Sequence, residues 1–429
     1  MVKKLYIKTY GCQMNFADAE RLKYIFEKNG WQITDNIDEA LAIFAIGCSV
    51  RQHAENKIFS FIDGLKNIKK QGRVVGLLGC TANIYKKDIL NQHSHINIIC
   101  GTDYFDLLPE KIESALKGEK IILVEENQNP FVIKTNSKNS IYVDIPITKG
   151  CDNFCSYCVV PYARGKLKSR NSVEIINEIK NLSDSGVRHV NLLGQNVNEY
   201  GKDLNIKYDF AELLKEISKI DKLLRISFMT SHPKDTTKKI LETMAENEKI
   251  MKHLHLPVQS GSNRILKLMN RKYSREEYLK IIEYARALIP DISITSDIMV
   301  GFPEETEKDF LETYEFVKEI QYDKIYIFKY SKRPFTRAAK LPNSISEKEK
   351  QRRHSLILNL QKKISRKISE NYINKNVQIL VEKINKNGYL EGKSLNNKTV
   401  YFSGDKNKIR SIIDVKIEQY SSGSYYAKL

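Results

Sequence analysis

Short apolar runs alternate with helical patterns over most of this 429-residue chain. Near the start, LAIFAI and RVVGLL are continuously apolar, as parallel strands buried on both faces are. The stretch between the first strands predicts a helix from Phe16 to Lys28, with Asn15 as N-cap and Gly30 beyond its end. This alternation predicts an α/β domain with a doubly wound parallel sheet, which we place at residues 1–122.

A second strand–helix series begins at IYVDIPITKG, after a polar stretch near residue 130 that we expect to be a linker. Six strand–helix repeats follow, fewer than the eight of a closed barrel, and they predict a partial (βα)6 TIM-type barrel. A capping-box pattern at Ser346 then opens one long basic helix with apolar residues at every fourth position, at Leu356, Leu360, Ile364 and Ile368. We place this second domain, helix included, at residues 137–368.

The last part of the chain changes pattern. VQILVEK, YLEGKSL, TVYFSG and DVKIEQY are short alternating stretches separated by polar turns. They predict a small all-β barrel of at most five strands at residues 370–429.

Charge is concentrated at the same end. The chain has 70 Lys and Arg against 52 Asp and Glu, and residues 331–429 hold +14 of the net +18. Such a basic region favours a polyanionic partner, most plausibly a nucleic acid. No apolar run approaches the ~18–20 residues of a membrane span, and the start does not resemble a signal peptide, so we expect a cytoplasmic protein without membrane contact.

Three cysteines form a C-x3-C-x2-C motif directly after the first strand of the second series: Cys151, Cys155 and Cys158. Three thiolates on one loop hold three irons of a [4Fe–4S] cube and leave the fourth iron open to another ligand. The alternative is zinc, which usually takes four protein ligands, and no second cysteine pair lies nearby. A disulfide is disfavoured in a cytoplasmic chain.

Cys12, Cys48 and Cys80 are far apart in sequence, but each follows a glycine just past a predicted parallel strand. The loops at the carboxyl ends of such strands converge on one edge of an open sheet. The pattern therefore predicts a second three-cysteine site, and the alternative is three buried apolar cysteines. Cys100 ends a strand without a preceding glycine, and we expect it to be a core residue.

These motifs resemble one family over the whole chain. TYGCQMN, GCSVRQHAENK, LLGCTA, GCDNFCSYCVVPYARGK, HLHLPVQSGS and SDIMVGFPEET are similar to segments of radical S-adenosylmethionine (SAM) methylthiotransferases. The likeness is strongest to the type that adds a methylthio group to N6-isopentenyladenosine in tRNA. Members of the family end in a small β-barrel, the TRAM domain, which is associated with RNA binding.

The resemblance implies two [4Fe–4S] clusters and SAM as cofactors. Cys151, Cys155 and Cys158 would be the catalytic set, whose cluster binds SAM and cleaves it to a 5′-deoxyadenosyl radical. The cluster of Cys12, Cys48 and Cys80 would serve sulfur delivery, and a second SAM would supply the methyl group. The implied partners are the anticodon stem-loop of tRNA and a reducing electron-donor protein, and we expect a monomer.

Several polar residues follow predicted barrel strands and are candidates to bind SAM at the carboxyl-terminal mouth of the barrel. These candidates are Gln195, Asn196, Ser231, Gln259, Ser260, Asp297 and Gly301. Some of them alternatively only cap the helices that follow. His253 and His255 share one face of a strand. A hydrogen-bonded barrel interior or a substrate contact is favoured there over a metal pair.

Basic and aromatic residues allow two interpretations each. Arg164, Lys166, Lys168 and Arg170 form either a solvated edge or a set of phosphate contacts. The tyrosines of the terminal module suit base stacking, although surface tyrosines also occur without RNA. These residues are Tyr389, Tyr401, Tyr420, Tyr425 and Tyr426.

The sequence departs from the family pattern in three places. Ile46-Gly47-Cys48 stands where Asn-Thr-Cys is usual, Phe335 stands where Gly is common, and the final SSGSYYAKL lacks a Leu-Gly step. The same chemistry on another substrate also stays open, namely methylthiolation of threonylcarbamoyladenosine in tRNA or of an aspartate in a ribosomal protein. A non-enzymatic iron–sulfur RNA-binding protein is the alternative from another functional class.

Overall fold

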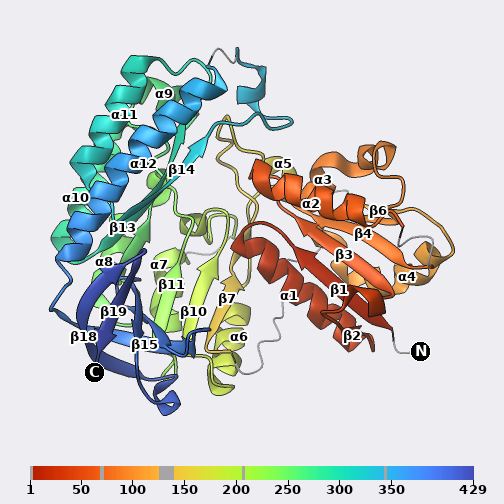
Figure 1. Ribbon diagram of the computed structural model, residues 1–429, viewed down its shortest axis with the longest axis horizontal. Helices are drawn as coiled ribbons and strands as arrows, with labels where there is room; N and C mark the ends of the chain where they lie inside the picture. Colours follow the sequence, from red (N-terminus) through yellow and green to blue (C-terminus); the bar gives the residue numbers. More distant parts are fainter. Residues whose placement is uncertain (1–2, 68–71, 125–139, 205–207, 343–344) are drawn as a thin grey trace.

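The computed structural model describes residues 3–67, 72–124, 140–204, 208–342 and 345–429, and the expected linker near residue 130 lies almost wholly outside these ranges. Figure 1 shows an N-terminal α/β part in red and orange, a central part with an outer layer of helices, and a small blue barrel. The N-terminal part and the small barrel contact different ends of the central part.

The N-terminal part is a six-stranded parallel sheet with the order β2-β1-β3-β4-β5-β6. Its strands are β1 (Lys4–Thr9), β2 (Gln32–Ile33), β3 (Ala42–Gly47), β4 (Val74–Gly79), β5 (Ile98–Cys100) and β6 (Ile121–Leu123). One hydrophobic cluster joins the sheet to α1 (Gln13–Lys28) and α4 (Leu108–Leu116). A separate cluster joins it to α2 (Gln52–Gly64) and α3 (Cys80–Tyr85). Helices on both faces confirm the doubly wound fold.

Helix α1 begins earlier than predicted. Its N-cap is Cys12, so the prediction of Asn15 as N-cap is wrong. The Asn15 amide instead donates to the carbonyl of Gly47 at 3.0 Å, and its oxygen accepts from Cys12 Sγ at 3.1 Å. These bonds tie the helix to the neighbouring strand end, and this tertiary role outweighs the local capping preference. Gly30 follows the helix end with φ +78°, as predicted.

The central part has six parallel strands in two sheets of three, and a single bridge between Ile226 and Ile250 links the sheets. The strands are β7 (Tyr142–Pro146), β10 (His189–Leu193), β11 (Arg225–Phe228), β12 (His253–His255), β13 (Ser293–Val300) and β14 (Lys324–Lys329). The helices are α6 (Ser172–Asp184), α7 (Phe210–Ser218), α8 (Lys238–Glu246), α9 (Asn263–Leu268), α10 (Arg275–Leu288) and α11 (Glu307–Ile320). This arrangement confirms the partial (βα)6 barrel.

The predicted long helix is α12 (Glu347–Glu370), which packs against α11 and β14. The Ser346 hydroxyl accepts from the backbone N–H of Glu349 at 3.2 Å, as the capping pattern predicts. The buried stripe includes Ile357, while Leu356 is exposed, so the strict four-residue spacing was wrong at its first position. The cause is the 3.6-residue period of a helix.

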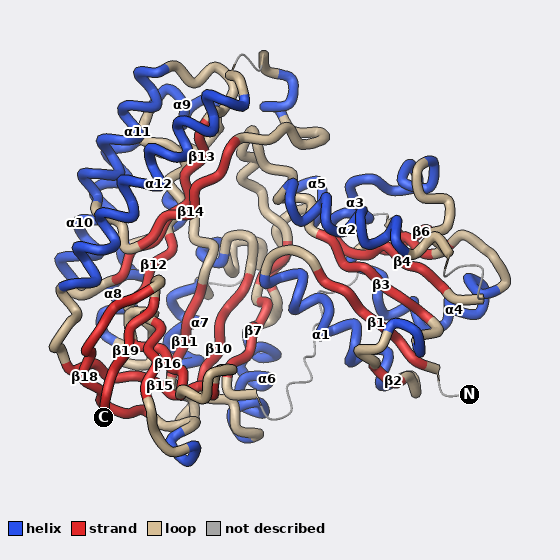
Figure 2. The backbone as a smooth tube through the Cα atoms, in the orientation of Figure 1, coloured by secondary structure: helices blue, strands red, loops and turns tan. Residues whose placement is uncertain are grey.

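The last part is a closed barrel with the order β15-β16-β17-β19-β18, which confirms the predicted five-stranded module. Its strands are β15 (Asn376–Ile384), β16 (Leu390–Ser394), β17 (Thr399–Phe402), β18 (Ile412–Ser421) and β19 (Ser424–Lys428). It packs at the amino ends of the central strands, where His189 Nδ1 lies 2.8 Å from Glu382 and Arg225 donates to Gln378 at 3.2 Å (Figure 2). The small barrel therefore lies at the end opposite to the mouth.

Among the helices of the described residues, none combines the length and the apolar character needed to cross a bilayer.

Candidate active site

Three adjacent strands of the N-terminal sheet, β1, β3 and β4, each lead into one cysteine. Cys12, Cys48 and Cys80 therefore meet at one sheet edge. A Cβ atom added at Gly11 would lie only 2.5 Å from the Cβ of Cys48, so the approach of these two loops needs a residue without a side chain. The repeated glycine before each cysteine thus has a steric cause.

The departure at Gly47 has a similar cause. A Cβ at Gly47 would lie 2.4 Å from both Thr81 Oγ1 and Ile58 Cδ1. A threonine at this position, as in the usual family pattern, would collide with these side chains. Glycine at this position therefore avoids a clash with Thr81 and Ile58 and leaves Cys48 in place.

The three thiols differ in their readiness to ionise. A hydrogen bond with Cys48 and the charge of Arg164 lower the pKa of Cys12 to about 6. The same hydrogen bond raises the pKa of Cys48, and burial raises the pKa of Cys80. This donor set fits a cluster bound through three cysteines.

Arg164 completes this site from another part of the chain. Its Nε donates to Cys80 Sγ at 3.1 Å, and its Nη2 lies 2.6 Å from Asp18, with only 3% of either charged side chain exposed. Arg170 is likewise buried and pairs with Glu178 at 2.7 Å. Both predicted alternatives, a solvated edge and a phosphate contact, are therefore wrong for these two arginines. Arg164 pairs with a buried carboxylate and Arg170 with a half-buried one.

The second cysteine site lies on one loop of the central part. Cys151, Cys155 and Cys158 lie between β8 (Thr148–Lys149) and the short helix α5 (Val160–Arg164). A Cβ at the residue before this loop, Gly150, would lie 1.9 Å from the carbonyl oxygen of Lys166, so the loop is closed tightly on its own far end. Burial raises the pKa of Cys151 to about 11 and that of Cys158 to about 12.

A buried arginine also contacts this second site. Arg271 Nη1 donates to Cys155 Sγ at 3.3 Å, and its Nη2 donates to the carbonyl of Pro257 at 2.7 Å. Its Nε donates to the hydroxyl of Tyr273 at 2.9 Å. Each cysteine site thus has one internal arginine whose N–H points at one sulfur.

Within the described ranges, no three His, Cys, Asp or Glu side chains form a group that could hold a single ion. A [4Fe–4S] cube carries its ligands on separate irons and spaces the thiolates further apart than one ion does.

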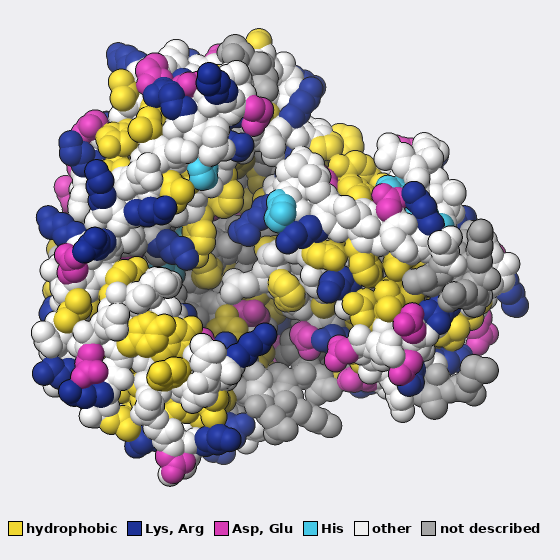
Figure 3. All heavy atoms as spheres, in the orientation of Figure 1, with side chains coloured by type: hydrophobic (Ala, Val, Ile, Leu, Met, Phe, Trp, Pro, Cys, Tyr) yellow, Lys and Arg dark blue, Asp and Glu magenta, His cyan; other side chains and the backbone are white. Residues whose placement is uncertain are grey.

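One cavity of about 800 Å³ lies between the barrel cysteine loop and the segment that follows Cys48. It is lined by residues 50–53, which follow Cys48, and by residues 157–159, which include Cys158. Gln259 and Asp297 line it from the barrel, and α12 closes one side. Figure 3 shows the molecule hollowed between its two halves, with Lys, Arg and His side chains at the edge. The barrel cysteine loop and the segment after Cys48 thus line one space at the barrel mouth.

The candidate SAM-binding residues fall into two groups. Gln259, with φ +71°, and Asp297 line the large cavity. Ser231 has a buried hydroxyl without a hydrogen-bond partner in the described part of the chain. These three residues have polar groups that remain suited to a ligand.

The other four candidates have internal contacts. Gln195 accepts from the backbone N–H of Gly150 at 2.5 Å. Asn196 donates to Asp235 at 2.7 Å, although its own buried Oδ1, like the Ser231 hydroxyl, has no hydrogen-bond partner in the described part of the chain. The fully buried hydroxyl of Ser260 lies 3.1 Å from that of Thr313. A Cβ at Gly301 would lie 2.3 Å from Lys350 Cγ, so this glycine admits the α12 lysine.

The two barrel histidines contact the same threonine hydroxyl. His253 Nε2 and His255 Nδ1 lie 2.9 Å and 3.0 Å from the hydroxyl of Thr295. Both histidines are buried, and burial lowers the pKa of His253 to about 3. The predicted hydrogen-bonded barrel interior is confirmed.

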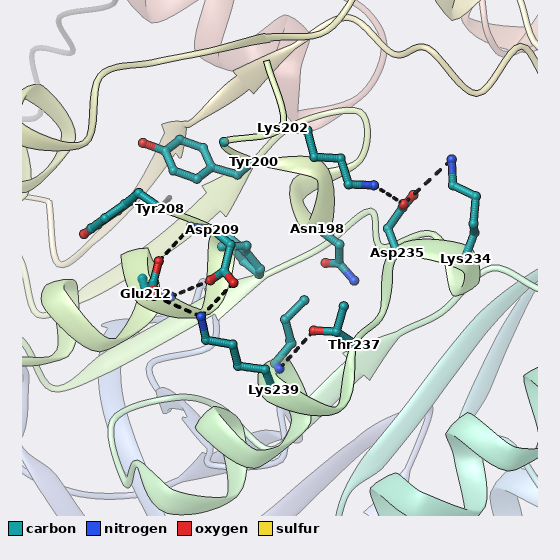
Figure 4. Close-up of a pocket in the computed structure, with 13 residues that line it drawn as sticks. Asn198, Tyr200, Lys202, Tyr208, Asp209, Glu212, Lys234, Asp235, Thr237 and Lys239 are labelled. Atoms are coloured by element: carbon teal, nitrogen blue, oxygen red, sulfur yellow. Dashed lines mark hydrogen bonds and ion pairs between the residues drawn. The ribbon is translucent and has the colours of Figure 1, made fainter. Parts of the chain in front are cut away.

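A smaller cavity of about 380 Å³ lies beside α7 and α8 (Figure 4). Its charged side chains pair with one another: Lys202 with Asp235, and Lys239 with Asp209 at 2.7 Å and with Glu212 at 3.0 Å. No candidate SAM-binding residue and no cysteine lines it. This pocket is electrostatically satisfied within itself and is a weaker candidate than the large cavity.

The tyrosines of the small barrel do not all lie on its surface. Tyr425 is buried in the barrel core, so its predicted availability for base stacking is wrong. Tyr389 is 40% exposed, and its ring centroid lies 6.5 Å from that of Tyr426, which in turn lies 5.7 Å from Tyr401. An aromatic surface of three rings remains.

Sequence reasoning missed the residues that surround the sulfurs. Arg164, Arg271 and Asn15 contact Cys80, Cys155 and Cys12. Arg164 could have been noticed because it follows the apolar PYA step, where an arginine has little reason to stand on a surface. Arg271 gives no such signal, since it lies in the polar stretch NRKYS.

Comparison with protein-family models gives two matches. The radical SAM superfamily matches residues 145–317, and the uncharacterized protein family UPF0004 matches residues 4–101. The first match includes the cysteines of the barrel loop, and the second includes the three cysteines of the N-terminal sheet.

Curated relatives match the whole chain. A protein of Thermosipho melanesiensis is 42% identical over 100% of this chain and 99% of its own length, and one of Thermotoga petrophila is 41% identical over 99% and 97%. A protein of Alkaliphilus oremlandii is 42% identical over 97% and 90%. All three are named tRNA-2-methylthio-N(6)-dimethylallyladenosine synthase.

Solved structures share the fold at low identity. The radical SAM methyltransferase TsrM from Kitasatospora setae, solved with tryptophan and a SAM analogue, has a TM-score of 0.57 and 11% identity over 79% of this chain and 75% of its own. The cobalamin-dependent radical SAM enzyme OxsB has a TM-score of 0.54 and 12% identity over 85% and 56%. The full-length relatives go beyond this likeness of fold: the chain belongs to the radical SAM methylthiotransferase family.

Proposed function

We propose that this protein adds a methylthio group to C2 of N6-dimethylallyladenosine in tRNA, next to the anticodon. The observation that carries the proposal is the cavity of about 800 Å³, which is lined by Cys158 of the barrel site and by residues 50–53, the segment that follows Cys48. The name shared by relatives that are 41–42% identical over nearly the whole chain supports the choice of substrate. A reaction that needs both a radical source and a sulfur source requires two such centres at one substrate.

The cofactors supply the hard chemistry, because an aromatic C–H is too weakly acidic for a side-chain base and a SAM-derived radical has to take the hydrogen. The residues of the chain bind and orient these cofactors and the substrate. Cys151, Cys155 and Cys158 would hold the cluster that binds SAM, and Gln259 and Asp297 would offer polar contacts to SAM. Cys12, Cys48 and Cys80 would hold a second cluster for sulfur delivery.

The cavity is suited to a nucleic-acid substrate. Arg51, Lys329 and Lys332 line it and offer contacts to phosphates, and the guanidinium of Arg51 lies 5.7 Å from the centroid of the Phe328 ring. A base that leaves its stack in a single-stranded loop would enter between these groups. The proposal therefore includes the anticodon stem-loop as the bound region, a separate reducing protein as electron donor, and a monomeric enzyme.

Nucleoside analysis of bulk tRNA tests the substrate. Deletion of the gene is expected to remove 2-methylthio-N6-dimethylallyladenosine and to leave its unmodified precursor in the tRNA. Loss of only the methylthiolated threonylcarbamoyladenosine would assign the substrate to the related tRNA enzyme. An unchanged tRNA profile with loss of methylthio-aspartate from a ribosomal protein would assign it to the protein-modifying relative.

Product analysis separates an enzyme from an RNA-binding iron–sulfur protein. The anaerobically reconstituted and reduced protein is expected to convert SAM to 5′-deoxyadenosine and methionine. If tRNA binds but no 5′-deoxyadenosine forms, the protein is not a radical enzyme and the proposed function is wrong.

A further inference from the structure

One side chain joins the two cysteine sites. Arg164 lies six residues after Cys158, at the end of α5, yet its guanidinium contacts the N-terminal site through Cys80 and Asp18. Helix α5 packs on α3, which begins at Cys80, and Asn83 of α3 donates to the carbonyl of Ala163 at 2.7 Å. The segment that presents the barrel cysteines therefore also reaches a sulfur of the other site.

We propose that Arg164 is a positioning residue that fixes the Cys80 sulfur and sets the reduction potential of the N-terminal cluster. The inference rests on the proposed function, because it requires a cluster held by Cys12, Cys48 and Cys80. It adds a role for a side chain that neither the cysteine pattern nor the names of the relatives assign.

The sign of the effect follows from charge. Reduction adds negative charge to a cluster, and an N–H donated to a ligating sulfur stabilises that charge and raises the potential. The Arg164 Nε to Cys80 Sγ distance is 3.1 Å, and the pair is buried, where water screens the interaction little. Asp18 holds the guanidinium at 2.6 Å and offsets part of its positive charge. Asp18 does not offset the hydrogen bond from Arg164 Nε to Cys80 Sγ, so this bond is the part of the interaction that raises the potential.

The protein contains a matched pair for comparison. Arg333 also crosses from the central part to the N-terminal part, where it pairs with Glu55 at 2.7 Å, and both side chains are at least 95% buried. Among its described contacts there is no cysteine; its other side-chain bond to the N-terminal part goes to Gln52 at 3.1 Å. Removing this pair disturbs the same interface without touching a sulfur.

The experiment measures the reduction potential of the N-terminal cluster by redox titration with electron paramagnetic resonance. The full chain is used with Cys151, Cys155 and Cys158 changed to alanine, so that one cluster gives the signal. The test variant combines Arg164→Gln with Asp18→Asn, which removes both charges and leaves no buried carboxylate unpaired. The control variant combines Arg333→Gln with Glu55→Gln.

The test variant is expected to hold about tenfold less reduced cluster relative to oxidised cluster at a fixed potential, a decrease of about 59 mV for a one-electron couple. The control variant is expected to keep the original potential. Asp18→Asn alone, which leaves Arg164 charged, is expected to raise the potential. An unchanged potential in the test variant would overturn the inference.

Iron content resolves the case in which the test variant does not load. Loss of iron from the N-terminal site with a normal cluster in the barrel, measured with all six cysteines present and reversed by Arg164→Lys, supports a positioning role. Loss from both sites indicates misfolding and overturns it. If the unmodified protein carries only one cluster, the two-cluster function itself fails, and this result is distinct from an unshifted potential in a fully loaded protein.

Discussion

The two cysteine sites of this protein are built in opposite ways. The barrel site takes three cysteines from eight consecutive residues, Cys151 to Cys158, on one tightly closed loop. The N-terminal site takes one cysteine from each of three strand ends, spread over 69 residues from Cys12 to Cys80. The first site is specified by local spacing and the second by sheet topology. We therefore expect substitutions in the two sites to have different effects on products and on iron content.

The first prediction separates the two sites by product. Cys12→Ala is expected to abolish methylthiolation of tRNA while 5′-deoxyadenosine is still formed, because only the N-terminal site loses a ligand. Cys158→Ala is expected to abolish both products. Both are measured by chromatography of SAM products and of digested tRNA.

Cys100→Ala is the control for this prediction, because Cys100 ends the next strand of the same sheet but is a buried core residue. It is expected to keep both products. Full methylthiolation by Cys12→Ala would refute the assignment of separate tasks.

The second prediction tests the role of topology through the backbone. Gly11→Ala is expected to deplete iron from the N-terminal site only, because the new Cβ would lie 2.5 Å from the Cβ of Cys48. Gly30→Ala is the matched control, since Gly30 also has positive φ but no atom lies within 4 Å of the added Cβ. Iron and sulfide analysis measures the effect, and equal iron in both variants would contradict the steric account.

The third prediction separates docking of the two halves from cluster binding. Glu55→Ala is expected to lower the free energy of unfolding by about 3–5 kcal/mol, because it leaves Arg333 buried and unpaired. Both clusters are expected to load at low temperature, since neither residue contacts a sulfur. Thermal unfolding measures the loss, and Glu315→Ala, which removes an exposed partner of Lys318, is expected to change little. Equal destabilisation by the two variants would show that the interface is not held by this pair.

The fourth and smallest effect concerns the loop before α12. Phe335 has φ +65° and is 61% exposed, and the family commonly has glycine at this position. Phe335→Gly is expected to raise the free energy of unfolding by about 0.5–1 kcal/mol, because glycine relieves the left-handed strain. Phe335→Ala loses the same ring but keeps the strain, so it is expected to be less stable than Phe335→Gly in denaturant titration. The opposite order would contradict the strain argument.

The sequence predicted the parts of the molecule that depend on local patterns. Strand–helix alternation led to both α/β parts, and glycine–cysteine repeats led to three strand ends that the structure makes neighbours. The contacts of Asn15, Arg164 and Arg271 with the sulfurs could not be predicted in this way. Arg164 and Arg271 contact cysteines 84 and 116 residues away in the chain, and a contact at that separation exists only once the fold is formed.

Iron content per chain tests the central claim of two separately built cluster sites most directly. The reconstituted protein is expected to hold about eight irons, as two [4Fe–4S] clusters require. A variant with Cys12, Cys48 and Cys80 changed to alanine, and one with Cys151, Cys155 and Cys158 changed to alanine, are each expected to hold about four. About four irons in the unmodified protein, or loss of all iron from either variant, would contradict the account.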